Sequence, residues 1–136
     1  MKRSDLVRIF LVEDNPMMRA HLRAALERPE DWTVVGEAED GSRAVETWSD
    51  HSPNLTVMDF MMPGMNGLQA AKEISKRHPE SPILMVTIDP SRELESEAKK
   101  AGVKGLCPKA DVKVLLNAAE ALLKGGTYFK QSVAAA

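Results

Sequence analysis

Residues 55–67 read LTVMDFMMPGMNG, an apolar run of strand length that ends in Asp59 and passes into a loop rich in turn-forming residues. The apolar residues 55–58 include a β-branched pair and predict a buried β-strand. The loop contains Pro63, Gly64, Asn66 and Gly67, residues that permit tight backbone turns. We therefore expect Asp59 to lie at the end of a buried strand.

The same arrangement, an apolar run followed by a polar side chain, occurs three more times. These runs and the polar residues after them are residues 9–12 with Glu13 and Asp14, residues 83–86 with Thr87, and residues 106–108 with Lys109. In an open parallel sheet, residues that leave the carboxyl ends of neighbouring strands line one crevice, where such folds bind their ligands. We therefore expect three acids, a hydroxyl and an ammonium group to meet in one pocket.

Between these runs the sequence has helical patterns, so the fold class is α/β with five βα units and a parallel sheet covered on both faces. The expected strands are residues 7–12, 33–37, 55–58, 83–87 and 103–107. The expected helices begin near Asn15-Pro16, Asp40-Gly41, Leu68, Asp89-Pro90 and Asp111.

The fourth expected helix has few apolar residues. Leu94, Ala98 and Ala101 are nearly its only apolar anchors among many charged side chains. Elements with few buried contacts open and shift most easily, so we expect this helix to be the moving part. An ordinary solvated surface helix is the alternative.

Size and charge restrict the function. The 136 residues form one domain, and a formal net charge of -2 argues against intrinsic nucleic-acid binding, which needs a basic face. The single cysteine, Cys107, lies in an apolar strand and is expected to be a small buried hydrophobe. No apolar run approaches transmembrane length, and charged residues interrupt any signal-peptide pattern after Lys2 and Arg3, so a cytoplasmic protein without membrane contact is expected.

The expected pocket suits phosphoryl chemistry. Clustered carboxylates repel one another, and Glu13, Asp14 and Asp59 together suit a hard cation, Mg²⁺ rather than Ca²⁺. Asp59 is the natural nucleophile, because it ends a central strand and a carboxylate can attack phosphorus to give an acyl phosphate. Lys109 and Thr87 would pair with phosphoryl oxygens. Each residue taken singly could instead be a cap, a loop or a solvated side chain; the joint pattern favours the site.

At this point the chain resembles the receiver domains of two-component response regulators, from about Arg8 to Lys124. The segments that carry the resemblance are residues 11–15, 58–67, 86–87 and 102–109, of which the second is highly specific. The resemblance implies a flavodoxin-like (βα)5 three-layer sandwich whose five-stranded parallel sheet has the order 2-1-3-4-5. It also implies that Asp59 accepts a phosphoryl group from a sensor histidine kinase. By the same resemblance, Glu13 and Asp14 hold Mg²⁺ with the Met61 backbone carbonyl, while Thr87 and Lys109 read the phosphorylated state.

Two positions depart from the family pattern. The place three residues before Lys109, usually aromatic, is Leu106, so a ring that swings inward is not expected. The place after Thr87, usually small, is Ile88, which we expect to crowd the pocket mouth and slow the access of small phosphodonors.

Residues 122–129 resemble the join to a DNA-binding domain in NarL/LuxR-type regulators. We therefore expect a receiver domain over residues 1–125, and over residues 126–136 a tail or the start of a linker to an output domain absent from this chain. DNA would be contacted only through that domain, and a homodimer is possible. A stand-alone phosphorelay intermediate or an interaction adaptor, including a degenerate receiver, is the alternative.

An enzyme of the haloacid dehalogenase type also uses an aspartate nucleophile, but it needs a second aspartate where this chain has Met61. We therefore expect no enzyme activity beyond the domain's own phosphorylation and dephosphorylation.

Overall fold

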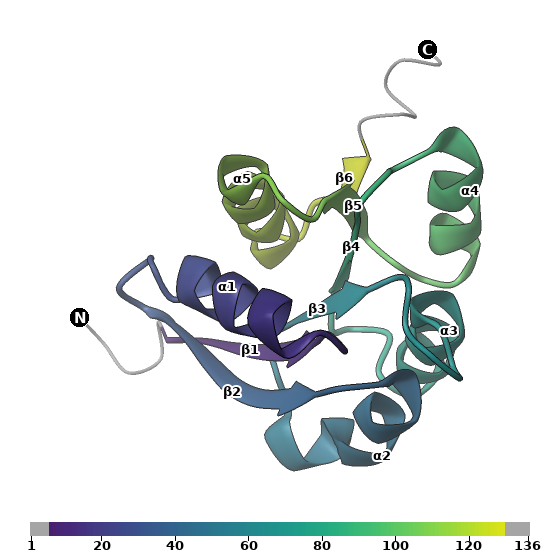
Figure 1. The fold of residues 1–136 in the computed structure, drawn as a ribbon, viewed down its shortest axis with the longest axis horizontal. Helices are drawn as coiled ribbons and strands as arrows, with labels where there is room; N and C mark the ends of the chain where they lie inside the picture. The colour runs from purple at the N-terminus through teal and green to yellow at the C-terminus, as the bar shows by residue number, and fades with distance from the viewer. Residues whose placement is uncertain (1–5, 130–136) are drawn as a thin grey trace.

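The structure, a computed structural model, describes residues 6–129 and contains one parallel sheet with helices on both faces (Figure 1). The strands are β1 (Val7–Val12), β2 (Trp32–Ala38), β3 (Leu55–Asp59), β4 (Ile83–Thr87), β5 (Gly105–Pro108) and β6 (Tyr128–Phe129). The helices are α1 (Pro16–Leu26), α2 (Gly41–His51), α3 (Gly67–Arg77), α4 (Arg92–Lys100) and α5 (Val112–Leu123). The strand order is β2-β1-β3-β4-β5-β6, so the expected α/β class and the order 2-1-3-4-5 are confirmed.

The sheet has one strand more than the five expected. Tyr128 and Phe129 pair in parallel with Gly105 and Leu106 at the edge of the sheet, inside the segment expected to be a tail. A strand of two residues is too short to show an alternating pattern, which is why the sequence did not indicate it. Residues 130–136, the rest of that tail, lie outside the described residues.

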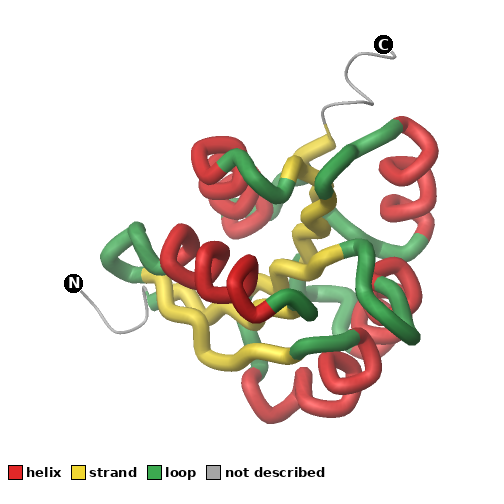
Figure 2. The backbone as a smooth tube through the Cα atoms, viewed as in Figure 1, coloured by secondary structure: helices red, strands yellow, loops and turns green. Residues whose placement is uncertain are grey.

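Alternate residues of the central strands supply two hydrophobic cores. Phe10 and Val12 face the layer that contains α2, α3 and α4, whereas Ile9 and Leu11 face the layer that contains α1 and α5. The tube view in Figure 2 shows these two helical layers on opposite sides of the strands. Because β1, β3 and β4 are covered on both sides, side chains at their ends lie at the rim of a well-packed core.

Most of the expected helix starts are confirmed. The side chains of Asn15, Asp40 and Asp111 accept hydrogen bonds from backbone N–H groups in the first turns of α1, α2 and α5. The expected Asp89-Pro90 start of α4 is wrong, because Ser91 is the cap and its Oγ accepts from the Leu94 N–H at 3.1 Å. Three adjacent residues suited to helix starts leave this boundary undecided in the sequence.

The anchors of α4 are largely as expected. Leu94 and Ala98 are buried and Ala101 is half-buried. Glu95 is also buried, and its carboxylate lies 3.9 Å from the Lys99 ammonium one turn later. Few apolar side chains and one buried carboxylate therefore hold α4 against the sheet. The mobility of α4 stays a prediction.

Cys107 is buried as expected, and burial, with a smaller contribution from Asp111, raises the pKa of its thiol to about 12. Among residues 6–129, no helix combines the length and the apolar character needed to cross a membrane.

A buried hydrogen bond ties α2 to β3, from the Trp48 indole N–H to the Thr56 hydroxyl at 2.9 Å. We predict that Thr56→Val lowers the free energy of unfolding by about 1–3 kcal/mol, because the buried indole donor loses its acceptor. In a Trp48→Phe background the same change should be nearly neutral. Urea unfolding of the double-mutant cycle measures the coupling; equal losses in both backgrounds would contradict this role of the hydrogen bond.

Candidate functional site

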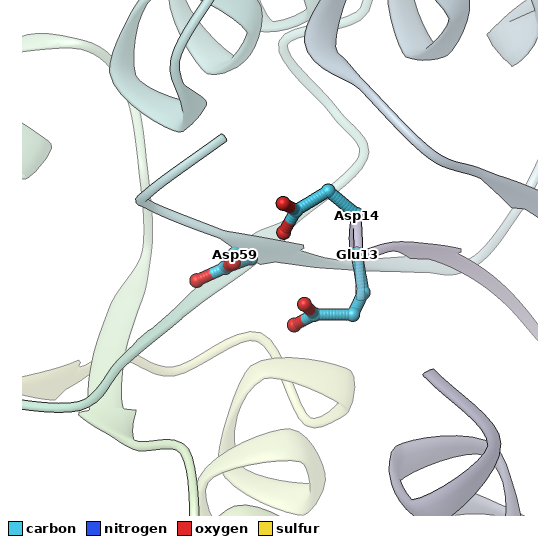
Figure 3. Close-up of side chains that lie close together, drawn as sticks. All are labelled: Glu13, Asp14 and Asp59. Carbon is cyan, nitrogen blue, oxygen red and sulfur yellow. The ribbon is translucent and has the colours of Figure 1, made fainter. Parts of the chain in front are cut away.

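The three acids expected at the strand ends lie together. Glu13 directly follows β1 and Asp59 ends β3, and the pairing of Val12 with Met58 places them on adjacent strands at the same edge. One carboxylate oxygen from each of Glu13, Asp14 and Asp59 lies within 4.8 Å of the others. Figure 3 shows the Glu13 and Asp14 carboxylates on either side of Asp59. The expected convergence of acids is therefore what the fold produces.

Lys109 bridges two of these acids. Its Nζ lies 2.8 Å from Glu13 Oε1 and donates to Asp59 Oδ2 at 3.0 Å. The side chains of Glu13 and Asp59 are almost fully buried, and that of Lys109 is 10% exposed. The backbone N–H of Lys109 donates to the Thr87 carbonyl at 2.8 Å, which fixes the start of the loop after β5. One buried ammonium therefore joins the ends of β1 and β3.

Thr87 completes the expected set at the end of β4. Its strand pairs with β3 so that Asp59 lies opposite Val86, which places Thr87 one residue beyond the level of Asp59. The side chain is 4% exposed. Thr87 is therefore on the correct edge of the sheet, beside the acids and Lys109.

Three further residues hold the acids in place, and the sequence did not single them out for this role. The Asn15 backbone N–H donates to Glu13 Oε2 at 3.1 Å, and the Arg19 guanidinium donates to the Glu13 carbonyl at 2.7 Å. A Cβ on Gly67 would clash with the Asp59 carbonyl oxygen, so the first residue of α3 must be glycine for the helix to approach β3 this closely. Gly67 follows Asn66, whose side chain caps α3, and this position at the start of a helix was the one sequence signal for the role of Gly67.

The electrostatics of the cluster favour bound positive charge. Burial raises the pKa of both Glu13 and Asp59; hydrogen bonds from Lys109 lower it, but not enough to offset burial. Burial alone would lower the pKa of Lys109, yet its close contacts with the Glu13 and Asp59 carboxylates outweigh that effect and raise it. In its ionised form the cluster therefore carries three negative charges against one positive charge.

Glu13 Oε1 depends on one shared cation. Lys109 Nζ lies 2.8 Å from this buried oxygen and pairs with it, although the oxygen accepts no well-aligned hydrogen bond within the described residues. One ammonium divided between two buried carboxylates leaves part of their charge uncompensated. The carboxylate oxygens of Glu13 and Asp59, with the more exposed Asp14 beside them, fit the ligands preferred by a hard divalent cation.

The structure also shows where Leu106 and Ile88, the two departures from the family pattern, lie. Leu106 is buried in the core beneath α4, so an aliphatic side chain occupies that position. Ile88 is 86% exposed and does not cover the acids in this structure, which gives no support to the expected crowding.

Comparison with known proteins agrees with the fold. Residues 9–120 match the family model described as the response regulator receiver domain. The chain belongs to this family. Its receiver domain is similar to that of the response regulator UvrY of Escherichia coli, with 29% identity over 95% of the chain and 60% of UvrY. It is also similar to the transcriptional regulatory protein YxjL of Bacillus subtilis, with 31% identity over 96% of the chain and 61% of YxjL.

Among solved structures, a LuxR-family response regulator from Aurantimonas is similar at 32% identity and a TM-score of 0.89, covering 95% of this chain and 93% of that one. The receiver domain of NarL from Mycobacterium tuberculosis is similar at 29% identity and a TM-score of 0.76, covering 85% of this chain and 98% of that one. The resemblance to NarL/LuxR-type regulators is thus confirmed. The chain spans just over half the length of the curated relatives DegU, YdfI and UvrY.

The electrostatics of the receiver domain lead to a stability prediction. In metal-free buffer at pH 7, Asp59→Asn should raise the free energy of unfolding by about 1 kcal/mol, because it removes a buried charge and leaves Glu13 and Lys109 as a balanced pair. A carboxyl whose folded-state pKa is raised loses stability as pH rises from its ordinary value of 3.8 through the raised value. The extra stability of Asp59→Asn over wild type should therefore be largest at pH values above the raised pKa of Asp59 and vanish at pH values below 3.8.

Urea unfolding of wild type and Asp59→Asn across this pH range, with a chelator present, measures the effect. Lys109→Met is the opposing control, and it should cost about 3 kcal/mol because two buried carboxylates lose their counter-charge. A destabilised Asp59→Asn protein at pH 7 would contradict the electrostatic description.

Proposed function

We propose that this chain is a phospho-acceptor switch in which Asp59 takes a phosphoryl group from a sensor histidine kinase. The observation that carries the proposal is the buried Lys109 ammonium held between Asp59 and Glu13 at the carboxyl edge of the sheet. A phosphoryl group on Asp59 would bring oxygens to this ammonium, which is already within hydrogen-bond distance of the carboxylate. Phosphoryl transfer depends mainly on such positioning and charge neutralisation.

Glu13, Asp14 and Asp59, with the Met61 backbone carbonyl, would hold Mg²⁺. When bound, the ion would neutralise the carboxylates and screen an incoming phosphate. The mutual proximity of the three acids, with the single Lys109 ammonium between two of them, supports this assignment. Asn15 and Arg19 would keep Glu13 oriented toward the ion through the bonds that they make to it.

In the transfer step an Asp59 carboxylate oxygen would form a bond to phosphorus as the bond from phosphorus to the kinase imidazole nitrogen breaks. The electron pair of that bond returns to the imidazole, and no proton has to leave Asp59. Hydrolysis of the acyl phosphate would use water and release inorganic phosphate. These are the only reactions that we assign to the domain.

Thr87 and Lys109 would report the phosphate to the rest of the fold. A charge-assisted hydrogen bond contributes roughly 1.5–3 kcal/mol. The Lys109 ammonium already donates to Asp59, so the Thr87 bond is the one wholly new contact and Lys109 adds only the difference between its old and new partners. A differential of about 3 kcal/mol is a shift of more than a hundredfold, enough to make an active form populated to about 1% the major one. The loop after Thr87 and α4 would be displaced, because α4 has few buried anchors.

For the whole protein we propose a cytoplasmic regulator. Residues 1–125 would form the receiver, and residues 126–136, of which β6 lies against the sheet, would lead toward a LuxR-type DNA-binding domain. The names of relatives such as the transcriptional regulatory proteins DegU and YdfI support a role in transcription. DNA would be contacted only through that further domain, and a homodimer would position it.

The test is covalent labelling. With acetyl phosphate and Mg²⁺, or with a cognate histidine kinase, we predict one phosphoryl group per chain, located on Asp59 by peptide mass spectrometry. Asp59→Asn should remain unlabelled. Glu13→Gln should need far more Mg²⁺ than wild type for the same labelling rate. Labelling that persists in Asp59→Asn, or that does not depend on Mg²⁺, would overturn the proposal.

A further inference from the structure

A shallow, open hollow lies between the first turns of α4 and the loop that connects β3 to α3. Its volume is about 510 Å³, within the range of sites that bind small ligands or side chains. Its apolar lining residues are Phe60, Met61, Leu68, Ile88 and Leu94. We refer to this site as the α4 groove.

Exposed hydrophobic side chains gather at the α4 groove. Four large hydrophobic residues between 6 and 129 are exposed, and two of them, Met61 at 66% and Ile88 at 86%, line this groove. Scattered single hydrophobic residues on a surface need no explanation, but apolar side chains gathered in one concavity mark an interaction site.

The rim of the α4 groove is acidic. Asp89, Glu93 and Glu97 line it, and none of its lining residues is basic. Glu93 and Glu97 are four residues apart on α4, so their side chains lie one helical turn apart along the same side of the groove. Glu97 lies 3.4 Å from Lys100, but both side chains are mostly exposed, and such a surface pair is weak enough to exchange for a partner's cation.

We propose that the α4 groove binds a cationic amphipathic helix of a partner protein. The apolar face of that helix would cover the exposed Ile88 and Met61 side chains and the edge of Leu94. Lysine or arginine side chains one turn apart would pair with Glu93 and Glu97, whose spacing matches the repeat of a helix laid alongside α4. Helix-in-groove recognition combines apolar anchors with flanking charges in this way, and the charges contribute mainly specificity and association rate.

The binding goes beyond the proposed phosphorylation, since it needs neither phosphate nor Mg²⁺. The test therefore uses the unphosphorylated full chain. The probe is a fluorescein-labelled, side-chain-stapled helical peptide with leucines on one face and lysines one turn apart on its flanks. A matched peptide has glutamate at each lysine position. Fluorescence anisotropy measures both affinities.

We expect the lysine peptide to bind about tenfold more tightly than the glutamate peptide. The double variant Glu93→Lys/Glu97→Lys should weaken lysine-peptide binding about tenfold and reverse the preference. Ile88→Asp should weaken binding of both peptides. The control Glu46→Lys/Glu120→Lys makes the same change in charge on α2 and α5, away from the groove, and should behave as wild type. All four substituted acids and Ile88 are exposed, so these variants should fold, which circular dichroism checks.

Lysine-peptide binding that is absent, or that the groove and control variants weaken equally, would overturn the proposal. So would concentration-dependent self-association that Ile88→Asp abolishes and the peptide displaces, because the occupant would then be a second copy of this chain.

Discussion

The ammonium of Lys109, held between the carboxylates of Glu13 and Asp59, is the interaction on which the site depends. Each acid ends a different strand, and the lysine comes from the end of a third. Without the ammonium, two almost fully buried carboxylates would face each other beside Asp14. The strand order is what brings these distant residues together, because it places β1, β3, β4 and β5 side by side in that order with their carboxyl ends at one edge.

This arrangement is only partly balanced in charge. Burial raises the pKa of both acids even though Lys109 is present, so the folded chain gains from any additional cation at this edge. The site also adjoins the α4 groove. Thr87 ends β4 beside the acids and also lines the α4 groove, so one residue borders both the candidate phosphorylation site and the candidate docking surface.

The strand ends were predictable because each is marked by an apolar run followed by a polar residue. A parallel sheet then places the polar residues from neighbouring strands at one edge. The buried Glu95 was not predictable, since nothing in a helix rich in charges marks which carboxylate turns inward. Gly67 was seen only as a turn residue, because its close approach to Asp59 depends on where α3 meets β3. The edge strand β6 follows from pairing with β5, a contact between residues far apart in the sequence that local patterns do not contain.

The most direct measurement is a crystal structure of the chain with Mg²⁺ and beryllofluoride. We predict beryllofluoride bonded to Asp59, Mg²⁺ contacting Glu13 or Asp14 together with Asp59, and Lys109 Nζ within hydrogen-bond distance of fluoride. Beryllofluoride absent from Asp59 at saturating Mg²⁺, or a cation bound elsewhere with Lys109 still between the two carboxylates, would contradict the account.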